Sequence, residues 1–148
     1  MNVGVRMKNS KQRVFIGVIL PADTANKLNN LSSYFARDWK FKDSRKYHIT
    51  IIPHWLVDDI DELLETCRNM ELELPKFDLE YTIAEAVWDL DGDQIIWALA
   101  TMSKEFNFIR KTIAEALQKQ IFEDFLIHTT LANNYTQNQL PFEKKKLT

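Results

Sequence analysis

Residues 47 to 56 read YHITIIPHWL, and residues 126 to 133 read LIHTTLAN. Both stretches are apolar and rich in residues that favour β-strands, yet each carries a histidine followed two positions later by a threonine. Alternate side chains of a strand point to the same face, so His48 and Thr50 should project together, with the isoleucines that follow each of them in the core. The first stretch therefore predicts a strand with one apolar and one polar face.

The second stretch repeats this arrangement, because His128 and Thr130 are also two positions apart. Each stretch is also the last of three expected elements that follow the same order: a buried strand, a helix and then the His-x-Thr strand. Val14, in the strand VFIGVIL, precedes His48 by 34 positions, and Ile95, in the strand IIWALA, precedes His128 by 33. We infer two similar lobes, each giving one His-x-Thr strand to a shared groove.

The composition is that of an ordinary globular protein. The chain has 148 residues, of which 45% are hydrophobic and 27% charged, and we expect one domain over residues 1–148 with a polar leader at 1–12. The leader has no apolar signal segment and no apolar run could span a bilayer, so we expect a cytoplasmic protein with no membrane partner. We also expect a monomer. Cys67 is the single cysteine, which excludes an internal disulfide.

Charge is distributed unevenly along the chain. The net charge is −2, but residues 1 to 46 hold ten Lys or Arg against three Asp or Glu, whereas residues 47 to 148 hold nine against eighteen. A basic first third can attract a ligand that carries phosphate. The same distribution also fits a solvated basic face beside an acidic one, and the sequence leaves both interpretations open.

Hydrophobic periodicity predicts the other elements. Cys67 falls on the apolar stripe of the second expected helix and should be core, and Pro53 should end the strand that begins at His48. The C-terminus could hold a last short edge strand protected by Lys144–Lys146, but we favour a solvated tail. The expected elements are a helix opened by Pro21, helices at about 58–70 and 103–120, a strand at 77–83 continued by AEAVW at 84–88, and a turn at 89–93.

Two histidines with two threonines suit chemistry at a phosphodiester. Because the histidine pKa is near 6.5, one imidazole can accept a proton while a second donates one. Each threonine hydroxyl can donate a hydrogen bond to a nonbridging phosphate oxygen. One isolated His-x-Thr is more often structural, but a matched second copy favours a shared site. The scheme requires no metal and no cofactor.

With these motifs the chain resembles the 2H phosphoesterases, in particular the RNA 2',3'-cyclic phosphodiesterases, also called 2'-5' RNA ligase-like proteins. The resemblance covers residues 13 to 133 and rests on HITI at 48–51, HTTL at 128–131, RVFIGVILP at 13–21 and IIWALA at 95–100. It implies an α+β, bilobal, pseudo-two-fold fold in which two antiparallel sheets line a central groove, with helices on the outside.

The resemblance also implies metal-independent cleavage of a cyclic phosphate or a 2'-5' phosphodiester. By this carry-over His48 and His128 are the acid/base pair, and Thr50 and Thr130 hold the phosphate. Many relatives carry an arginine at the position of Asn133, and that arginine is absent here. The residues alone do not assign acid and base, although we favour His128 as the base.

Other residues near the first motif are candidate substrate contacts, the basic ones for phosphate and the aromatic ones for stacking on a base. These candidates are Lys42, Arg45, Lys46, Tyr47, Trp55 and Arg13. We interpret His54 as a loop or groove-rim residue, because Pro53 precedes it. The aspartates of DLDGD lack the spacing of a calcium loop, and the three histidines lack that of a zinc site.

We therefore expect an enzyme that opens the 2',3'-cyclic phosphate of a nucleotide or an RNA end. One alternative is a phosphodiesterase for 2'-5' oligonucleotides or cyclic oligonucleotides. Another is a noncatalytic nucleotide- or RNA-binding module.

Overall fold

The computed structural model describes residues 11–89, 91–121, 125–134 and 143–147. The three described α-helices are α2 (Ala22–Asn29), α3 (Ile60–Asn69) and α4 (Lys104–Ala116), with short 3-10 turns η1 (Asn30–Ser33) and η2 (Ser44–Lys46). The described strands are β1 (Gln12–Ile19), β2 (Trp39–Phe41), β3 (His48–Val57), β4 (Tyr81–Trp88), β5 (Gln94–Ala100), β6 (Ile127–Asn134) and β7 (Lys144–Lys146).

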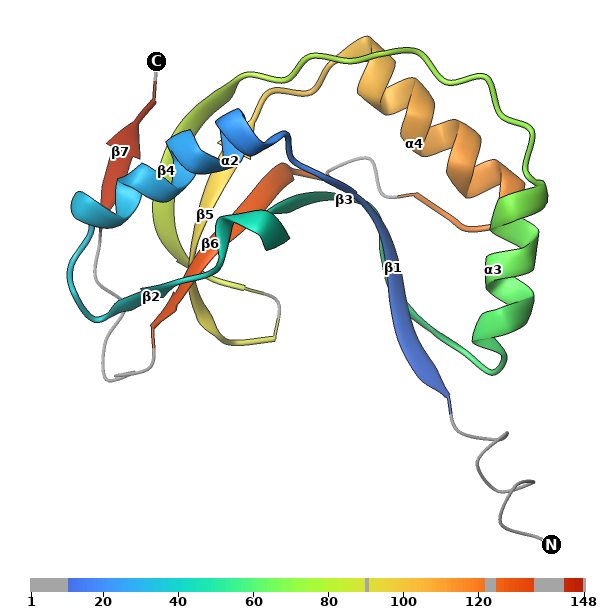
Figure 1. The fold of residues 1–148 in the computed structure, drawn as a ribbon, viewed down its shortest axis with the longest axis horizontal. Coiled ribbons are helices and arrows are strands. Elements are labelled where there is room, and N and C mark those ends of the chain that lie inside the picture. Colours follow the sequence, from blue (N-terminus) through green and yellow to red (C-terminus); the bar gives the residue numbers. More distant parts are fainter. Residues whose placement is uncertain (1–10, 90, 122–124, 135–142, 148) are drawn as a thin grey trace, which may run out of the picture.

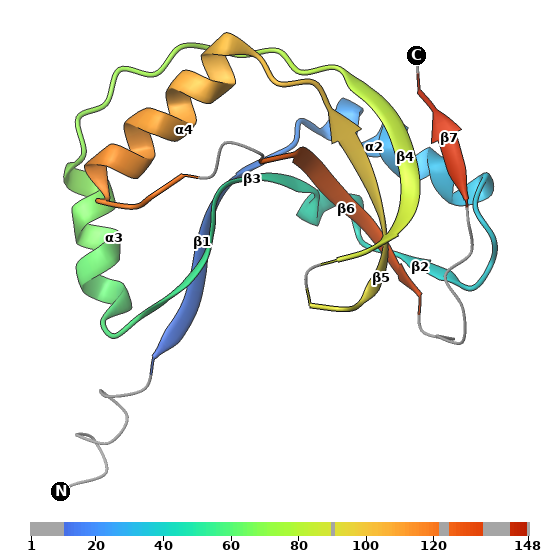
Figure 2. The same cartoon turned by 180° about the vertical axis from the view of Figure 1, so that it is seen from behind.

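The strands form two antiparallel sheets, as the resemblance predicts. β1 pairs with β3 in the smaller sheet, and the larger sheet has the order β2-β6-β5-β4-β7. Together the sheets form an arch, with α2 over the larger sheet and α3 and α4 at the other end (Figures 1 and 2). The two His-x-Thr strands, β3 and β6, contact each other where the lobes meet. The expected α+β bilobal fold is confirmed.

The core lies between the sheets and the helices on the convex side of the arch. Ile49 and Ile51 are each 3% exposed, which confirms that the apolar face of β3 is buried. The helix expected after Pro21 ends at Asn29, but all of its expected apolar positions are buried, with Ala25 and Leu28 in α2, Leu31 in η1 and Phe35 after it. Apolar burial on this side leaves the polar faces of β3 and β6 toward the concave side.

Both His-x-Thr strands carry a β-bulge directly after the threonine. Gly17 pairs with Thr50 but Ile16 pairs with Ile52, so one residue of β3 is extra. In the same way, Trp97 pairs with Thr130 but Ile96 pairs with Ala132. In each strand the extra residue and the one after it are both buried, and the residue after those returns to the half-buried face. The internal two-fold repeat therefore extends to an irregularity that alternation alone does not predict.

The structure corrects four expectations. Pro53 does not end its strand, since β3 continues to Val57; a proline is tolerated there because β3 has a partner on one side only. Residues 77 to 80 are not strand, and β4 begins at Tyr81. Cys67 is half-buried rather than core, like the other apolar residues of α3 that face inward, and no residue of α3 is fully buried. The tail is not simply solvated, because Lys144–Lys146 form β7 against β4.

The turn at DLDGD is confirmed in its described part. The amide groups of Asp91 and Asp93 both donate to Asp89 Oδ1, and Gly92 has φ 84°, a left-handed conformation that glycine adopts without strain. The leader at 1–10 lies outside the described residues, as do 135–142 of the tail. In the described parts of the chain, no helix is long and apolar enough to cross a bilayer.

Candidate active site

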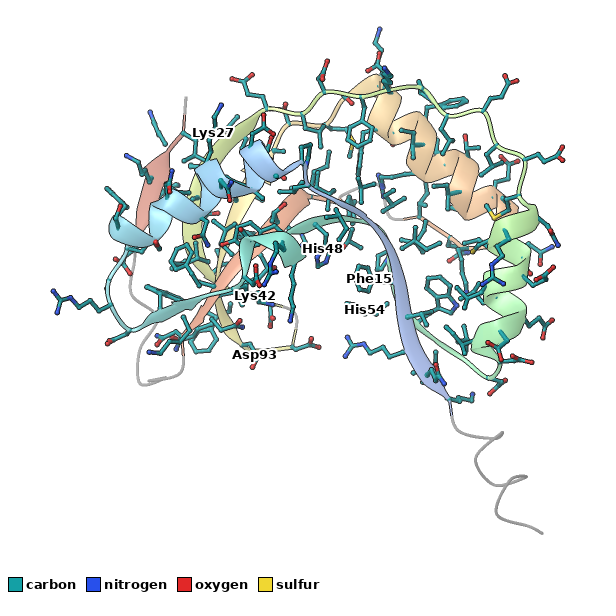
Figure 3. The ribbon with its side chains drawn as sticks, viewed as in Figure 1. Phe15, Lys27, Lys42, His48, His54 and Asp93 are labelled. Atoms are coloured by element: carbon teal, nitrogen blue, oxygen red, sulfur yellow. The ribbon has the colours of Figure 1, made fainter. Side chains whose placement is uncertain are left out.

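The polar face of the smaller sheet carries the first motif. His48 pairs with Ile19 and Thr50 pairs with Gly17, and directly opposed residues of antiparallel strands point to the same face. The exposure of β1 alternates, with Arg13, Phe15, Gly17 and Ile19 on its exposed face. Figure 3 shows His48 and Phe15 on the inner side of the arch. This face of β1 thus lies beside the first His-x-Thr pair.

The larger sheet carries the second motif in the corresponding arrangement. His128 pairs with Leu99, and Thr130 pairs with Trp97. His128 and Thr130 are half-buried, whereas Thr129 between them is fully buried and its hydroxyl bonds to the Tyr81 hydroxyl at 2.7 Å. Burial of Thr129 on the core side fixes the orientation of its two neighbours toward the concave side.

The backbone selects one tautomer for each imidazole. His48 Nδ1 lies 3.0 Å from the carbonyl oxygen of Lys46, and His128 Nδ1 lies 3.0 Å from that of Leu126. A carbonyl can only accept a hydrogen bond, so each Nδ1 carries a hydrogen and donates it. Nε2 is then the nitrogen left for a substrate: it accepts a proton in the neutral ring and donates one in the charged ring.

Each imidazole also packs against an aromatic ring from the neighbouring strand. The Phe15 and His48 centroids are 4.9 Å apart, and those of Trp97 and His128 are 4.8 Å apart. The Trp97 indole donates to Glu85 Oε1 at 3.3 Å, which fixes the plane of the ring. Each histidine is therefore held by one backbone hydrogen bond and one aromatic face.

The His48 imidazole acts electrostatically on that of His128. Burial lowers the pKa of His128 below its ordinary 6.5, the hydrogen bond to Leu126 opposes this, and the charge of His48 lowers the pKa further. A charge on His48 is felt at His128 because the two strands meet at the lobe boundary. His128 is thereby favoured in its neutral, proton-accepting form near neutral pH.

The basic candidates differ in how the structure places them. The Lys42 amide donates to the Leu131 carbonyl at 2.8 Å, directly beside Thr130. Lys40 pairs with Asn133, which is half-buried like Thr130 and shares its face. Lys42 lies two residues further along the chain, so alternation directs its exposed side chain to that face too. Lys42 is thus a cation beside the second motif.

Two of the other three basic candidates, Arg45 and Lys46, have weaker links to the site. Arg45 forms a bidentate pair with Asp43, which lowers the pKa of that carboxyl to about 2. Its guanidinium is thus already engaged by a carboxylate. Lys46 supplies the carbonyl that orients His48, and its side chain is exposed. Contacts of these two side chains with a substrate stay predictions.

The two aromatic candidates lie elsewhere. Tyr47 is 1% exposed and its hydroxyl accepts from Asn29 Nδ2, so it is a core residue rather than a stacking surface. Trp55 pairs with Val14 on the face of the smaller sheet away from the histidines. The Lys119 ammonium lies 4.7 Å from its ring centroid. The two register shifts in β3 cancel, so Trp55, seven positions after His48, lies on the face that simple alternation from His48 assigns to it.

His54 is not a loop residue, because it lies inside β3. Its ring centroid is 4.8 Å from that of Phe15, the residue that also contacts His48 (Figure 3). Arg13 lies on the same exposed face of β1, and its Nη2 is 3.9 Å from Asp91 Oδ2 in the β4–β5 turn. The structure therefore places Arg13 and His54 on the same face of the smaller sheet as His48.

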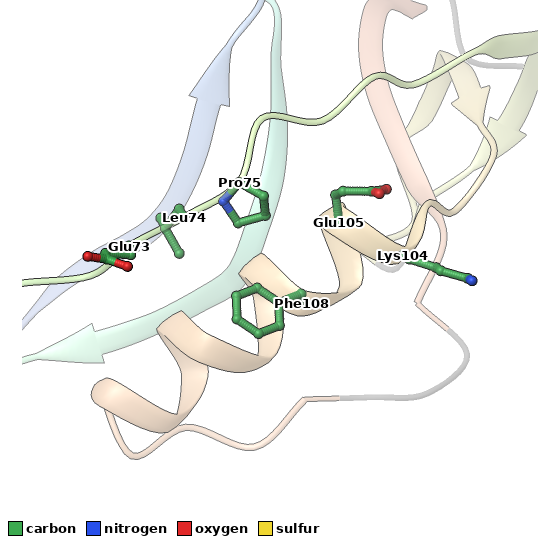
Figure 4. Close-up of a pocket in the computed structure, with 6 residues that line it drawn as sticks. All are labelled: Glu73, Leu74, Pro75, Lys104, Glu105 and Phe108. Atoms are coloured by element: carbon green, nitrogen blue, oxygen red, sulfur yellow. The ribbon is translucent and has the colours of Figure 1, made fainter.

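Two surface hollows are separate from this face. One of about 620 Å³ lies between residues 73–75 and the start of α4 and contains no histidine (Figure 4). Another of about 540 Å³ lies among Trp55, the start of α3 and the end of α4. Within the described ranges, no group of three or more His, Cys, Asp or Glu side chains is arranged to hold a metal ion.

Sequence reasoning missed three neighbours of the histidines. The alternation of RVFIGVI puts Phe15 and Gly17 on the same face as Arg13. Their position beside the motif can be predicted only when the β1–β3 pairing is known. The contact of Trp97 with His128 likewise requires the register between β5 and β6. The missing signal was strand pairing, not residue type.

Comparison with solved structures identifies close similarity in fold. The chain is similar to TT0787 of Thermus thermophilus, with a TM-score of 0.59 and 19% identity, over 91% of this chain and 84% of TT0787. It is also similar to E. coli LigT, in the apo form and complexed with 3'-AMP. That match has a TM-score of 0.63 and 16% identity, over 93% of this chain and 84% of LigT. Neither the family models nor the curated proteins give a match to the sequence. The chain therefore has the bilobal α+β fold of TT0787 and E. coli LigT.

Proposed function

We propose that the protein is a metal-independent phosphodiesterase that opens the 2',3'-cyclic phosphate of a nucleotide or an RNA end. One observation carries the proposal. Two imidazoles, one from each lobe, each donate Nδ1–H to the carbonyl two residues earlier, which leaves both Nε2 atoms for a substrate. A purely structural histidine has no need of a symmetry-related partner held in the same tautomer.

The two histidines divide the proton transfers in this proposal. His128, whose pKa is lowered by burial, accepts a proton from the attacking water through Nε2. The water oxygen bonds to phosphorus, and the bond between phosphorus and the 3' oxygen breaks. His48 gives its Nε2 proton to that 3' oxygen, so the product is a 2'-phosphate with a free 3' hydroxyl.

The phosphate is held by groups on the same two faces. The hydroxyls of Thr50 and Thr130 share their faces with His48 and His128 and donate to the nonbridging oxygens. Lys42 supplies a positive charge beside Thr130, on the face of β6 that Asn133, the position of the relatives' arginine, also shares. Together these groups stabilise the charge that develops on the phosphate in the transition state.

The comparison supports a nucleotide ligand, because E. coli LigT has been crystallised with 3'-AMP. Two other substrates fit the same apparatus, namely 2'-5' oligonucleotides and cyclic oligonucleotides. A noncatalytic nucleotide- or RNA-binding module would use the same face without turnover.

The test is incubation with a panel of 2',3'-cyclic nucleotides, 2'-5' oligonucleotides and cyclic dinucleotides in the presence of a chelator. We expect a 2'-phosphate product, resistant to the chelator. His48→Ala and His128→Ala should each lower kcat by about 10²- to 10⁴-fold, the usual contribution of one general acid or base, with unchanged circular dichroism. Lys27→Gln, on the outer helix α2, is the control (Figure 3). Salt-sensitive binding without turnover would favour the binding module instead.

A further inference from the structure

The concave face of the smaller sheet continues beyond the catalytic pair. In the register of β1 and β3, the order along this face is His48 with Ile19, Thr50 with Gly17, and finally Leu56 with Arg13. Val14 and Trp55 occupy the opposite face, so their neighbours Arg13 and His54 face the concave side with His48. The exposed states of Arg13 and His54 agree with this placement.

Phe15 spans the distance between the two imidazoles of this face. Its ring lies 4.9 Å from the His48 ring and 4.8 Å from the His54 ring, and it is 38% exposed. Figure 3 shows the three rings in sequence along the inner side of β1. An exposed aromatic ring between two polar groups matches the repeat of a nucleic-acid strand, in which each base is flanked by phosphates.

Arg13 is the cation at the far end of this row. Its partner Asp91 comes from the β4–β5 turn in the other sheet, at 3.9 Å, and the two side chains are 59% and 68% exposed. An exposed pair of this length contributes little stability and is readily exchanged. A phosphate can accept two parallel hydrogen bonds from the guanidinium, whereas the approach of Asp91 at 3.9 Å is longer than a hydrogen bond.

We propose that Arg13 and His54 form a second anion-binding position, which takes the phosphodiester of the nucleotide adjacent to the reacting cyclic phosphate. In the bound state that phosphodiester replaces Asp91 as the partner of Arg13, and His54 donates a hydrogen bond to it. The substrate class is then the end of an oligonucleotide rather than a mononucleotide. This inference rests on the proposed function, whose chemistry it does not alter.

The experiment compares two substrates, a 2',3'-cyclic mononucleotide and a dinucleotide that ends in a 2',3'-cyclic phosphate. We expect wild-type kcat/KM to be higher for the dinucleotide. Arg13→Gln should lower the ratio of dinucleotide to mononucleotide kcat/KM by about three- to tenfold, as expected for an exposed charge-assisted hydrogen bond. His54→Ala should lower the same ratio. Asp91→Asn should raise it by about two- to fivefold, because Arg13 loses its competing partner.

Lys27→Gln removes one positive charge from α2 and should leave the ratio unchanged, which separates a local contact from a change in net charge. Arg13→Gln should also reduce the salt dependence of dinucleotide kcat/KM by about 0.7 in the logarithmic slope, the value for one phosphate contact on a single strand. Equal ratios in wild type, Arg13→Gln and Asp91→Asn would overturn the inference while leaving the proposed function intact.

A binding measurement keeps the inference testable if neither substrate is cleaved, which would itself contradict the proposed function. Tryptophan fluorescence titrations would compare a dinucleotide 2'-phosphate with a mononucleotide 2'-phosphate. Tighter binding of the dinucleotide that is lost in Arg13→Gln supports the second anion position. Equal affinities for the two ligands in wild type contradict it.

Discussion

The close approach of the two strands beside the first histidine predicts the effect of Gly17→Ala. A methyl group at Gly17 would lie 2.8 Å from the Ile49 carbonyl oxygen, 3.0 Å from Phe15 Cε2 and 3.4 Å from His48 Cδ2. The Phe15 ring can rotate away, but the carbonyl belongs to the β3 backbone and must move with its strand. Overpacking of this kind costs about 1 to 3 kcal/mol, and a displaced imidazole should lower kcat by about three- to tenfold.

Thermal unfolding followed by circular dichroism would measure the first effect, and we expect the Tm of Gly17→Ala to fall by about 3 to 10 °C. Gly92→Ala is the matched control, since it meets no atom within 4 Å and is disfavoured only by its φ of 84°. It should lose about 1 kcal/mol and keep its kcat for a cyclic mononucleotide. An unchanged Tm and kcat in Gly17→Ala would refute the close packing of β1 on β3.

Three further variants test the neighbourhood of the second histidine. Trp97→Leu should admit water to the adjacent His128 imidazole and raise the lowered pKa of that ring. Because His128 as a base works only when deprotonated, the acidic limb of the kcat/KM pH profile should move to higher pH. Lys42→Gln should raise KM about three- to tenfold and reduce its salt dependence, whereas Lys27→Gln should not; equal KM values would remove Lys42 from the site. Tyr81→Phe should lower the free energy of unfolding by about 1 to 2 kcal/mol in urea titrations, because it leaves the buried Thr129 hydroxyl without its 2.7 Å partner.

The sequence predicted the elements that depend on local pattern. Alternation placed Ile49 in the core and His48 on the polar face, and helical spacing identified Leu28 and Leu31 as buried positions. The repeated order of strand, helix and His-x-Thr strand predicted the two lobes. These features follow from periods of two and about 3.6 residues, which a single sequence carries.

The features that the sequence missed depend on pairing between distant segments. The bulge after Thr130 changes the face of the later residues of β6, so counting from His128 would put Ala132 rather than Asn133 on the polar face. The pairing of Lys144–Lys146 with β4 joins segments about 60 positions apart along the chain, and a run of three lysines gives no apolar signal for it. Local propensity carries no information on such contacts.

The central claim is that the two lobes supply one acid and one base. The most direct test is the pH dependence of kcat/KM for a 2',3'-cyclic nucleotide in wild type, His48→Ala and His128→Ala. We predict a bell-shaped profile for wild type, loss of the acidic limb in the residual activity of His128→Ala, and loss of the basic limb in that of His48→Ala. The persistence of both limbs in both variants, at rates near wild type, would contradict the claim.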